Sequence, residues 1–170
     1  MVERLSRYTY PTAPRHPLMV CASLVGHPAN LGALCRTVEA FRLQSLVVNN
    51  GAIAHTSAFR GLAASTHQWQ PLEDCPVEHL PDWLRHQAQQ GYTAIALDLD
   101  AQAQRLPEFS YPQRSILVLG KELTGIPQHV RRCCSQTVTI PQFGLVESLN
   151  VQTAAAIAIY EYVRQWGAPG

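Results

Sequence analysis

Short apolar runs that alternate with helical segments constrain the fold of this chain more than any other feature. Runs of about five apolar residues bounded by turn-forming residues predict buried strands, and segments of helical periodicity separate nearly every pair of them. Such alternation is typical of a mostly parallel sheet covered by helices on both faces, so we predict an α/β fold. The predicted strands are 18–25, 46–49, 93–97, 115–119 and 137–140, and the predicted helices are 30–43, part of 54–68, 82–90 and 151–166, with 71–81 as a loop.

The 170 residues are enough to bury one core. The first 17 residues carry three arginines without the apolar run of a signal peptide, so we expect a basic tail over 1–17 and one domain over 18–170. No apolar run reaches the roughly 18 residues of a membrane span, and no Cys or His pair has metal-ligand spacing, so neither membrane nor metal is expected. The adjacent Cys133 and Cys134, among five cysteines, favour reduced thiols and a cytoplasmic location.

Charge is unevenly distributed along the chain. Between Glu73 and Glu108 the sequence carries seven acids and two arginines, a net charge of −5, whereas the remainder has a net charge of +6. A basic face that contacts nucleic acid is compatible with this layout, although the total charge of +1 alone does not suggest it. Charge by itself leaves a nucleic-acid partner and an ordinary solvated surface equally open.

The segment before the last predicted helix has the character of a binding loop. Pro141 and Gly144 keep it out of regular structure, and Ser148 is expected to cap the helix over 151–166. That helix is apolar nearly all round, so we expect it to be buried, together with the loop that precedes it. Buried irregular backbone needs hydrogen-bond partners, and a bound ligand is one source of them.

Two further loops follow predicted strands, where α/β sheets bind ligands. After the first strand, Asn30 is expected to cap a helix, Gly32 allows another backbone to approach, and Arg36 lies on about the same face as Gly32. After the strand 115–119, Gly120 and Gly125 flank a Lys-Glu pair in a loop whose amides can wrap a ligand. None of these loops matches the phosphate-binding P-loop, the G-x-S-x-G hydrolase motif or the G-x-G-x-x-G dinucleotide motif.

Together the three segments resemble the SpoU-type (TrmH-like) ribose 2′-O-methyltransferases of the SPOUT superfamily, over about residues 18–166. The first motif, Asn-x-Gly-x-x-x-Arg, is followed by Gly-x-Glu-x-x-Gly after an apolar strand, and then by Ile-Pro and Ser-Leu-Asn before a small-residue helix. Order and spacing both fit. The run Leu-Cys-Arg-Thr-x-Glu over 34–39 and the preceding Ala-Ser-Leu over 22–24 are especially similar to the catalytic domain of the eukaryotic enzymes that methylate guanosine 18 of tRNA. The matching residues are Asn30, Gly32, Arg36, Gly120, Glu122, Gly125, Ile140, Pro141, Ser148, Leu149 and Asn150.

The resemblance implies a C-terminal trefoil knot, S-adenosylmethionine held in that knot, a homodimer paired partly through the last helix, and RNA, above all tRNA, as the substrate. It also implies which residues contact the cofactor and which take part in catalysis. The implied cofactor-binding residues are Leu97, Leu119, Gly120, Glu122, Gly125, Ile140, Gln142, Ser148 and Leu149, and the implied catalytic residues are Arg36, Asn30, Glu122, Ser148 and Asn150.

The implied reaction brings a ribose hydroxyl in line with a sulfonium methyl group, which needs a base or a strong positive field at the hydroxyl. An arginine stays protonated in almost any protein site, so we favour Arg36 as a group that binds the adjacent phosphate and polarises the hydroxyl over Arg36 as a proton acceptor. Glu122 either offsets the sulfonium charge or fixes its loop. Ser148 and Asn150 shape the pocket even if they only cap the helix and tie the loop.

The sequence departs from the family pattern at Arg42, where glycine is usual after the first helix, and at Lys121, where Asn or Ser is more usual. Two alternatives stay open. One is a wobble-position tRNA or rRNA 2′-O-methyltransferase, although the wobble enzymes usually depart from the Ser-Leu-Asn triplet that this chain keeps. The other is a non-catalytic knotted protein that binds RNA or cofactor, against which the intact motif residues argue.

Overall fold

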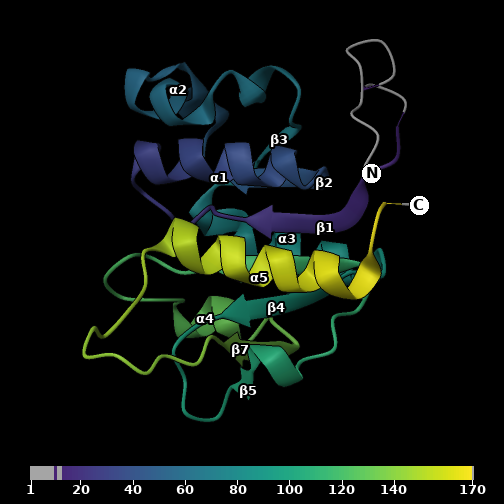
Figure 1. Cartoon of the computed structure of the whole chain (residues 1–170), viewed down its shortest axis with the longest axis vertical. Helices are drawn as coiled ribbons and strands as arrows, with labels where there is room; N and C mark the ends of the chain where they lie inside the picture. Colours follow the sequence, from purple (N-terminus) through teal and green to yellow (C-terminus); the bar gives the residue numbers. More distant parts are fainter. Residues whose placement is uncertain (1–9, 11–12, 170) are drawn as a thin grey trace.

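The computed structural model describes Tyr10 and residues 13–169. Within this part, a parallel sheet of seven strands runs in the order β3-β2-β1-β6-β4-β7-β5 (Figure 1). Every pairing is parallel, which confirms the predicted α/β fold. The C-terminal trefoil knot stays a prediction of the family resemblance. The strands are β1 (His16–Cys21), β2 (Leu43–Val48), β3 (Leu72–Asp74), β4 (Thr93–Leu97), β5 (Gln104–Arg105), β6 (Ser115–Leu119) and β7 (Gln136–Thr139).

Helices cover both faces of the sheet, and each face has its own hydrophobic core. In β1, Leu18 and Val20 belong to one core while Met19 and Cys21 belong to the other, because successive side chains of a strand point to opposite faces. Helices α1, α2 and α5 pack on the first core, and α3 and α4 on the second. The helices are α1 (Pro28–Ala40), α2 (Ser57–Ala63), α3 (Leu80–Gln89), α4 (Gln128–Arg131) and α5 (Val151–Trp166). None of the described helices is long and apolar enough to cross a membrane.

Several predicted boundaries are wrong by two to four residues. Helix α1 begins at Pro28, whose fixed φ suits the first helical turn, so Asn30 lies inside the helix and does not cap it. The loop predicted over 71–81 contains β3, and β5 is absent from the prediction. Strands of two or three residues at the edges of a sheet carry no usable period, so their sequences do not predict them.

The expectation that the last helix is buried all round is also wrong. Helix α5 has the predicted bounds, but its cap is Asn150, whose Oδ1 accepts from the amides of Gln152 and Thr153 at 2.9 and 3.4 Å. Its exposed face carries Ile157 and Tyr160, and most of the loop over 141–150 is exposed as well. Apolar composition predicted burial here, although one chain covers only one face of this helix.

Arg42 shows why glycine is usual after the first helix. Its φ of 51° lies in the left-handed region, which side chains other than glycine rarely adopt. Its buried guanidinium donates to the carbonyl oxygens of Tyr10, Ala13 and Pro14 and lies 4.3 Å from the Tyr10 ring centroid. These contacts offset the backbone strain and tie the segment before β1 to the end of α1. The rest of the predicted basic tail, residues 1–9 and 11–12, lies outside the described residues.

Gly32 allows α1 and α2 to pack with their backbones in contact. A Cβ atom at this position would lie 2.2 Å from the carbonyl oxygen of Phe59 in α2, so the close approach predicted for Gly32 is confirmed. We expect Gly32→Ala to lower the free energy of unfolding by about 1–3 kcal/mol, because the helices must move apart. Urea unfolding followed by circular dichroism measures this change.

Gly61, inside α2, is the matched control. A Cβ there would meet no atom within 4 Å, so Gly61→Ala should leave stability unchanged or raise it by up to about 1 kcal/mol. Equal effects of the two substitutions would contradict the packing role of Gly32.

Candidate active site

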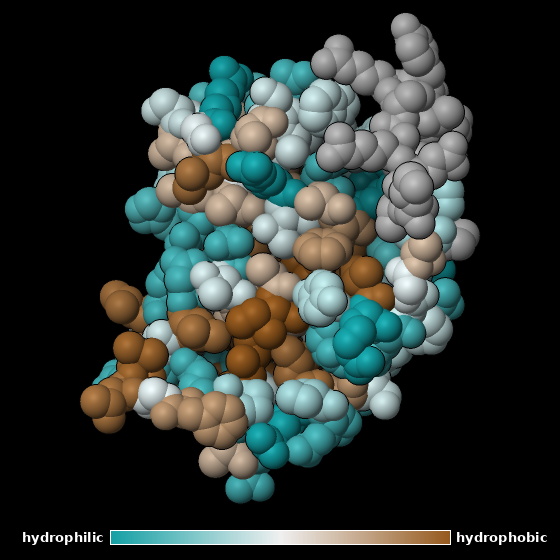
Figure 2. Space-filling view, viewed as in Figure 1, coloured by the Kyte–Doolittle hydropathy of each residue, from teal (hydrophilic) through white to brown (hydrophobic). Residues whose placement is uncertain are grey.

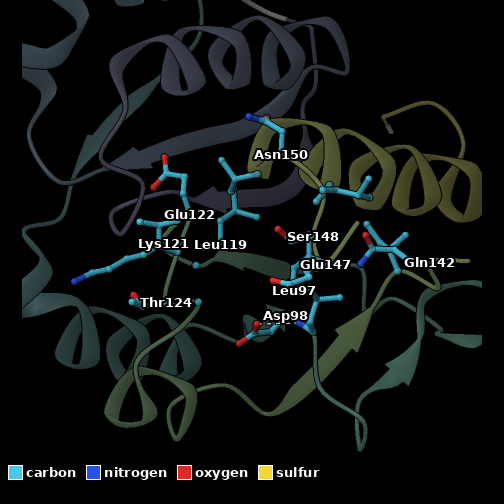
Figure 3. Close-up of a pocket in the computed structure, with 18 of the residues that line it drawn as sticks. Leu97, Asp98, Leu119, Lys121, Glu122, Thr124, Gln142, Glu147, Ser148 and Asn150 are labelled. Atoms are coloured by element: carbon cyan, nitrogen blue, oxygen red, sulfur yellow. Dashed lines mark hydrogen bonds between the residues drawn. The ribbon is translucent and has the colours of Figure 1, made fainter. Parts of the chain in front are cut away.

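A pocket of about 590 Å³ lies at the carboxyl ends of β4, β6 and β7, between the loop that follows β6 and the segment that precedes α5 (Figure 3). This is the edge of a parallel sheet where ligands bind. The structure brings all nine residues predicted to contact the cofactor to this one pocket. They are Leu97, Leu119, Gly120, Glu122, Gly125, Ile140, Gln142, Ser148 and Leu149.

The loop from Gly120 to Gly125 closes on itself at one wall of the pocket. Lys121 and Gly125 exchange two backbone hydrogen bonds of 3.0 Å. A Cβ atom on Gly120 would lie 2.7 Å from the carbonyl carbon of Gly125, and Gly125 itself has a φ of +67°. Both glycines are therefore required by the closure of the loop, before any ligand is considered.

A chain of hydrogen bonds joins the three predicted motifs at the rim of the pocket. Asn150 donates from Nδ2 to Oδ1 of Asn30 at 3.2 Å, and Asn30 donates from Nδ2 to Oε1 of Glu122 at 3.3 Å. The same Asn150 caps α5 through its oxygen. The first turn of α1, the loop after β6 and the start of α5 are thus held together by three side chains that are far apart in sequence.

Glu122 occupies the amino-terminal end of α1, which has no acidic residue in its own first turn. Burial raises the pKa of this carboxyl group, but hydrogen bonds from its own amide, from Asn30 and from the amides of Gly26 and His27 outweigh burial and hold the pKa below the usual 4.5. An ionised carboxylate at this end of a helix also interacts favourably with the helix dipole. The geometry therefore favours the loop-fixing role of Glu122 over the sulfonium-offsetting one.

The remaining catalytic candidates are placed differently. Ser148 lines the pocket, is exposed, and its hydroxyl makes no hydrogen bond with another described residue. Arg36 is exposed on α1 and does not line the pocket, and no described residue forms an ion pair with it. The structure thus gathers Asn30, Glu122, Ser148 and Asn150 around the pocket and leaves Arg36 outside it.

An ion pair at the pocket wall is absent from the sequence-based prediction. Arg131 of α4 binds Asp98 and Asp100, which follow β4, and Asp98 also accepts from the amide of Leu99 at 2.9 Å. The Asp98 side chain is 14% exposed, and its Oδ1 would lie 3.2 Å from a Cβ atom built on Gly125. The available signal was an Asp-Leu-Asp sequence immediately after a predicted strand, at the edge where ligands bind. Among the described residues no group of His, Cys, Asp or Glu has the arrangement of a metal site.

The hydrogen bonds to Glu122 make stability depend on pH. Because the folded-state pKa lies below 4.5, the ionised carboxylate stabilises the protein above that pH, and this contribution is lost as the pH falls through the folded-state pKa. We therefore expect Glu122→Gln to be less stable than the parent protein at pH 7, with the difference shrinking as the pH approaches 3. Urea unfolding at a series of pH values measures it.

Glu147 provides the control, since it lines the same pocket and accepts no hydrogen bond from a described residue. Glu147→Gln should track the parent protein across the whole pH range. A Glu122→Gln curve that stayed parallel to that of the parent would refute the assignment of the carboxylate to the α1 terminus.

Comparison with known proteins gives relatives that carry the same enzyme name in bacteria, yeast and mouse. The tRNA (guanosine(18)-2′-O)-methyltransferase of Escherichia coli is 32% identical over 164 residues, covering 95% of this chain and 70% of that protein. The mouse tRNA (guanosine(18)-2′-O)-methyltransferase TARBP1 is 39% identical over 148 residues, covering 87% of this chain. The chain spans only about a tenth of the length of the mouse protein and of the similarly named yeast protein, 9% and 11% respectively.

Solved structures agree with the sequence relatives. The A. aeolicus TrmH/SpoU tRNA modifying enzyme superposes with a TM-score of 0.79 at 26% identity, covering 89% of this chain and 76% of that one. The SpoU methyltransferase AviRb from Streptomyces viridochromogenes, solved with AdoMet, shares the fold with a TM-score of 0.77 at 22% identity, covering 97% of this chain and 63% of that one. Residues 17–160 match the model of the SpoU rRNA Methylase family. The chain, with its parallel sheet and its three motifs gathered at one pocket, belongs to that family.

Proposed function

We propose that this protein transfers a methyl group from S-adenosylmethionine to a ribose 2′-hydroxyl of tRNA, at guanosine 18. The observation that carries the proposal is the hydrogen-bonded rim of Asn30, Glu122 and Asn150, which joins the three family motifs at a pocket of small-molecule size. The proposed organisation is one methyltransferase domain over 18–170, preceded by a basic tail. A cytoplasmic location is supported by cysteines that are all free in the structure.

The pocket residues fit S-adenosylmethionine. Leu119, Ile140 and Leu149 offer apolar contacts to a base, and the closed loop after Gly120 lets a ligand lie against backbone. Gln142 adds an amide side chain to the same lining. When bound, this cofactor supplies an activated methyl group on a positively charged sulfur, and AviRb, which shares the fold, was solved with it.

The protein's own side chains would position the reactants. The Asn150–Asn30–Glu122 chain holds the pocket walls at a fixed spacing, so the bound groups need little reorganisation during the reaction. Arg36 is exposed on α1, outside the pocket, so it is placed to contact bound RNA and not the cofactor. We assign it to the phosphate next to the reacting ribose, where its fixed charge favours loss of the hydroxyl proton.

The Arg36 assignment separates catalysis from cofactor binding. We expect Arg36→Ala to leave affinity for S-adenosylhomocysteine nearly unchanged in calorimetry, because the residue lies outside the pocket. Methyl transfer to a tRNA transcript should fall by about 10²-fold or more, the usual loss on removing one electrostatic or acid–base group. Arg36→Lys should rescue little, since a lysine cannot make a two-pronged phosphate contact.

Mass spectrometry of the methylated transcript identifies the nucleotide. Modification at guanosine 18 supports the proposal, whereas modification at the wobble position or only of rRNA would select the alternative enzymes. Arg60, on α2 with its guanidinium bonded to Ala54 and His55, is a matched control, and Arg60→Ala should retain full activity. Full activity of Arg36→Ala would refute the mechanism, and loss of cofactor binding by that variant would assign Arg36 to the fold.

We further propose a homodimer that pairs through the exposed faces of α5 and α1. Ile157 and Tyr160 of α5 are 41% and 60% exposed, and Tyr160 packs edge-on against Phe41 at the end of α1. Figure 2 shows an apolar area over α5 on this face. A continuous apolar patch rimmed by polar residues is typical of a protein interface, and a two-fold axis lets the same patch pair with itself.

Sedimentation equilibrium at micromolar concentration should therefore give a dimer for the parent protein. Ile157→Asp should shift it towards monomer, because a carboxylate would be buried without a partner at the interface. Leu62 on α2 is 48% exposed and serves as the control, so Leu62→Asp should stay dimeric. A monomeric parent protein, or a dimeric Ile157→Asp variant, would contradict this interface.

A further inference from the structure

Lys121 is the single lysine of a chain whose other basic side chains are twelve arginines. It lies in the closed loop after β6, where its backbone exchanges two hydrogen bonds of 3.0 Å with Gly125. The residue lines the pocket and is exposed, and in Figure 3 its side chain extends away from Ser148 and Gln142. A closed loop of backbone therefore holds one ammonium group at the mouth of the pocket.

Most of the other cations already have partners. Within the described part of the chain, eight arginine side chains are engaged by carboxylates, carbonyl oxygens or other polar groups. Among the described residues, the side chains of Lys121, Arg36 and Arg132 are the basic ones that form no hydrogen bond or ion pair with another described residue. These three remain available to a negatively charged ligand.

Two of the three belong to segments that meet at the rim of the pocket. Helix α1, which carries Arg36, lies against the loop of Lys121, because Asn30 donates to Glu122 at 3.3 Å. Six positions separate Asn30 from Arg36, which corresponds to ~9 Å along a helix. Arg132 directly follows α4, on the opposite face of the sheet from α1, and does not line the pocket. Lys121 and Arg36 are therefore the two unpaired cations around this rim.

The proposed cofactor does not account for a lysine at this place. S-adenosylmethionine carries a carboxylate, an ammonium and a sulfonium group, so its net charge is positive and a further cation repels the molecule as a whole. RNA, in contrast, carries a negative charge on every nucleotide. A ribose hydroxyl that reaches the pocket brings its neighbouring phosphates to the rim, and a lysine contacts a phosphate as a point charge.

We infer that Lys121 Nζ binds a second backbone phosphate of the substrate RNA, distinct from the phosphate assigned to Arg36. The inference rests on the proposed function. The two cations have different tasks: Arg36 acts on the reacting hydroxyl, whereas Lys121 supplies affinity for the RNA at the pocket mouth. This division makes their variants distinguishable by kinetics.

Lys121→Met removes the charge and keeps a side chain of similar length. At about 0.1 M salt, binding of a tRNA transcript should weaken roughly 3- to 10-fold. The plot of log affinity against log salt concentration should become shallower by about 0.7–0.9, the amount expected for one phosphate. The KM for tRNA should rise while kcat changes little, because this contact is equally strong before and during methyl transfer. Lys121→Arg, which keeps the charge, should restore parent values.

Arg132→Met is the matched control, since it removes the same charge from another exposed and unpaired side chain outside the pocket. It should keep the KM and the salt dependence of the parent protein. Affinity for S-adenosylhomocysteine, measured by calorimetry, should be unchanged in both variants, which also reports that the pocket is intact.

The single lysine permits a second measurement on the unsubstituted protein. An acetylating reagent has Lys121 as its one side-chain amine in this chain, and mass spectrometry of the corresponding peptide follows the reaction. Bound tRNA should slow acetylation of Lys121, whereas S-adenosylhomocysteine should leave the rate unchanged.

The remaining outcomes separate the inference from the proposed function. If Lys121→Met keeps the parent KM and salt dependence, loses affinity for S-adenosylhomocysteine as strongly as for tRNA, or behaves like Arg132→Met, the inference is wrong while the proposed function stands. Acetylation of Lys121 at the same rate with and without tRNA would also overturn it. If the parent protein neither binds S-adenosylhomocysteine nor methylates tRNA, the proposed function fails and the inference fails with it.

Discussion

The hydrogen-bonded rim is the interaction on which the pocket depends. Asn150 caps α5 through its oxygen and donates from its Nδ2 to Asn30 in the first turn of α1. Asn30 in turn donates to Glu122 in the loop after β6. The positions of these three segments at the pocket are therefore coupled through one chain of hydrogen bonds.

Most of the sheet was predictable because its signals are local. The strands 93–97 and 115–119 have the predicted bounds, since each is a continuous apolar run between turn-forming residues. The family resemblance supplied the nine expected cofactor residues, and all nine line the pocket. Their mutual contacts were not predictable, because a sequence gives no distance between Asn30 and Glu122, or between Asp98 and Arg131.

The errors share physical causes as well. Ser148 and Asn30 have good capping side chains, but the position of the first helical turn decides which residue caps, and Pro28 and Asn150 set those positions. The last helix was expected to be buried because its composition is apolar. The composition of a helix indicates how much apolar surface must be kept from water. It does not indicate whether the same chain or a second copy covers that surface.

The contact of the Glu122 carboxylate with the first turn of α1 has a consequence for folding. The bond between Asn30, in the first turn of α1, and Glu122, 92 positions later, forms only after most of the chain has been synthesised and β6 has joined the sheet. Contacts of such sequence separation form late and slowly, since the intervening chain must first be ordered. The first turn of α1 should thus be among the last parts to become rigid, and the pocket would not exist on a nascent chain that ends before α5.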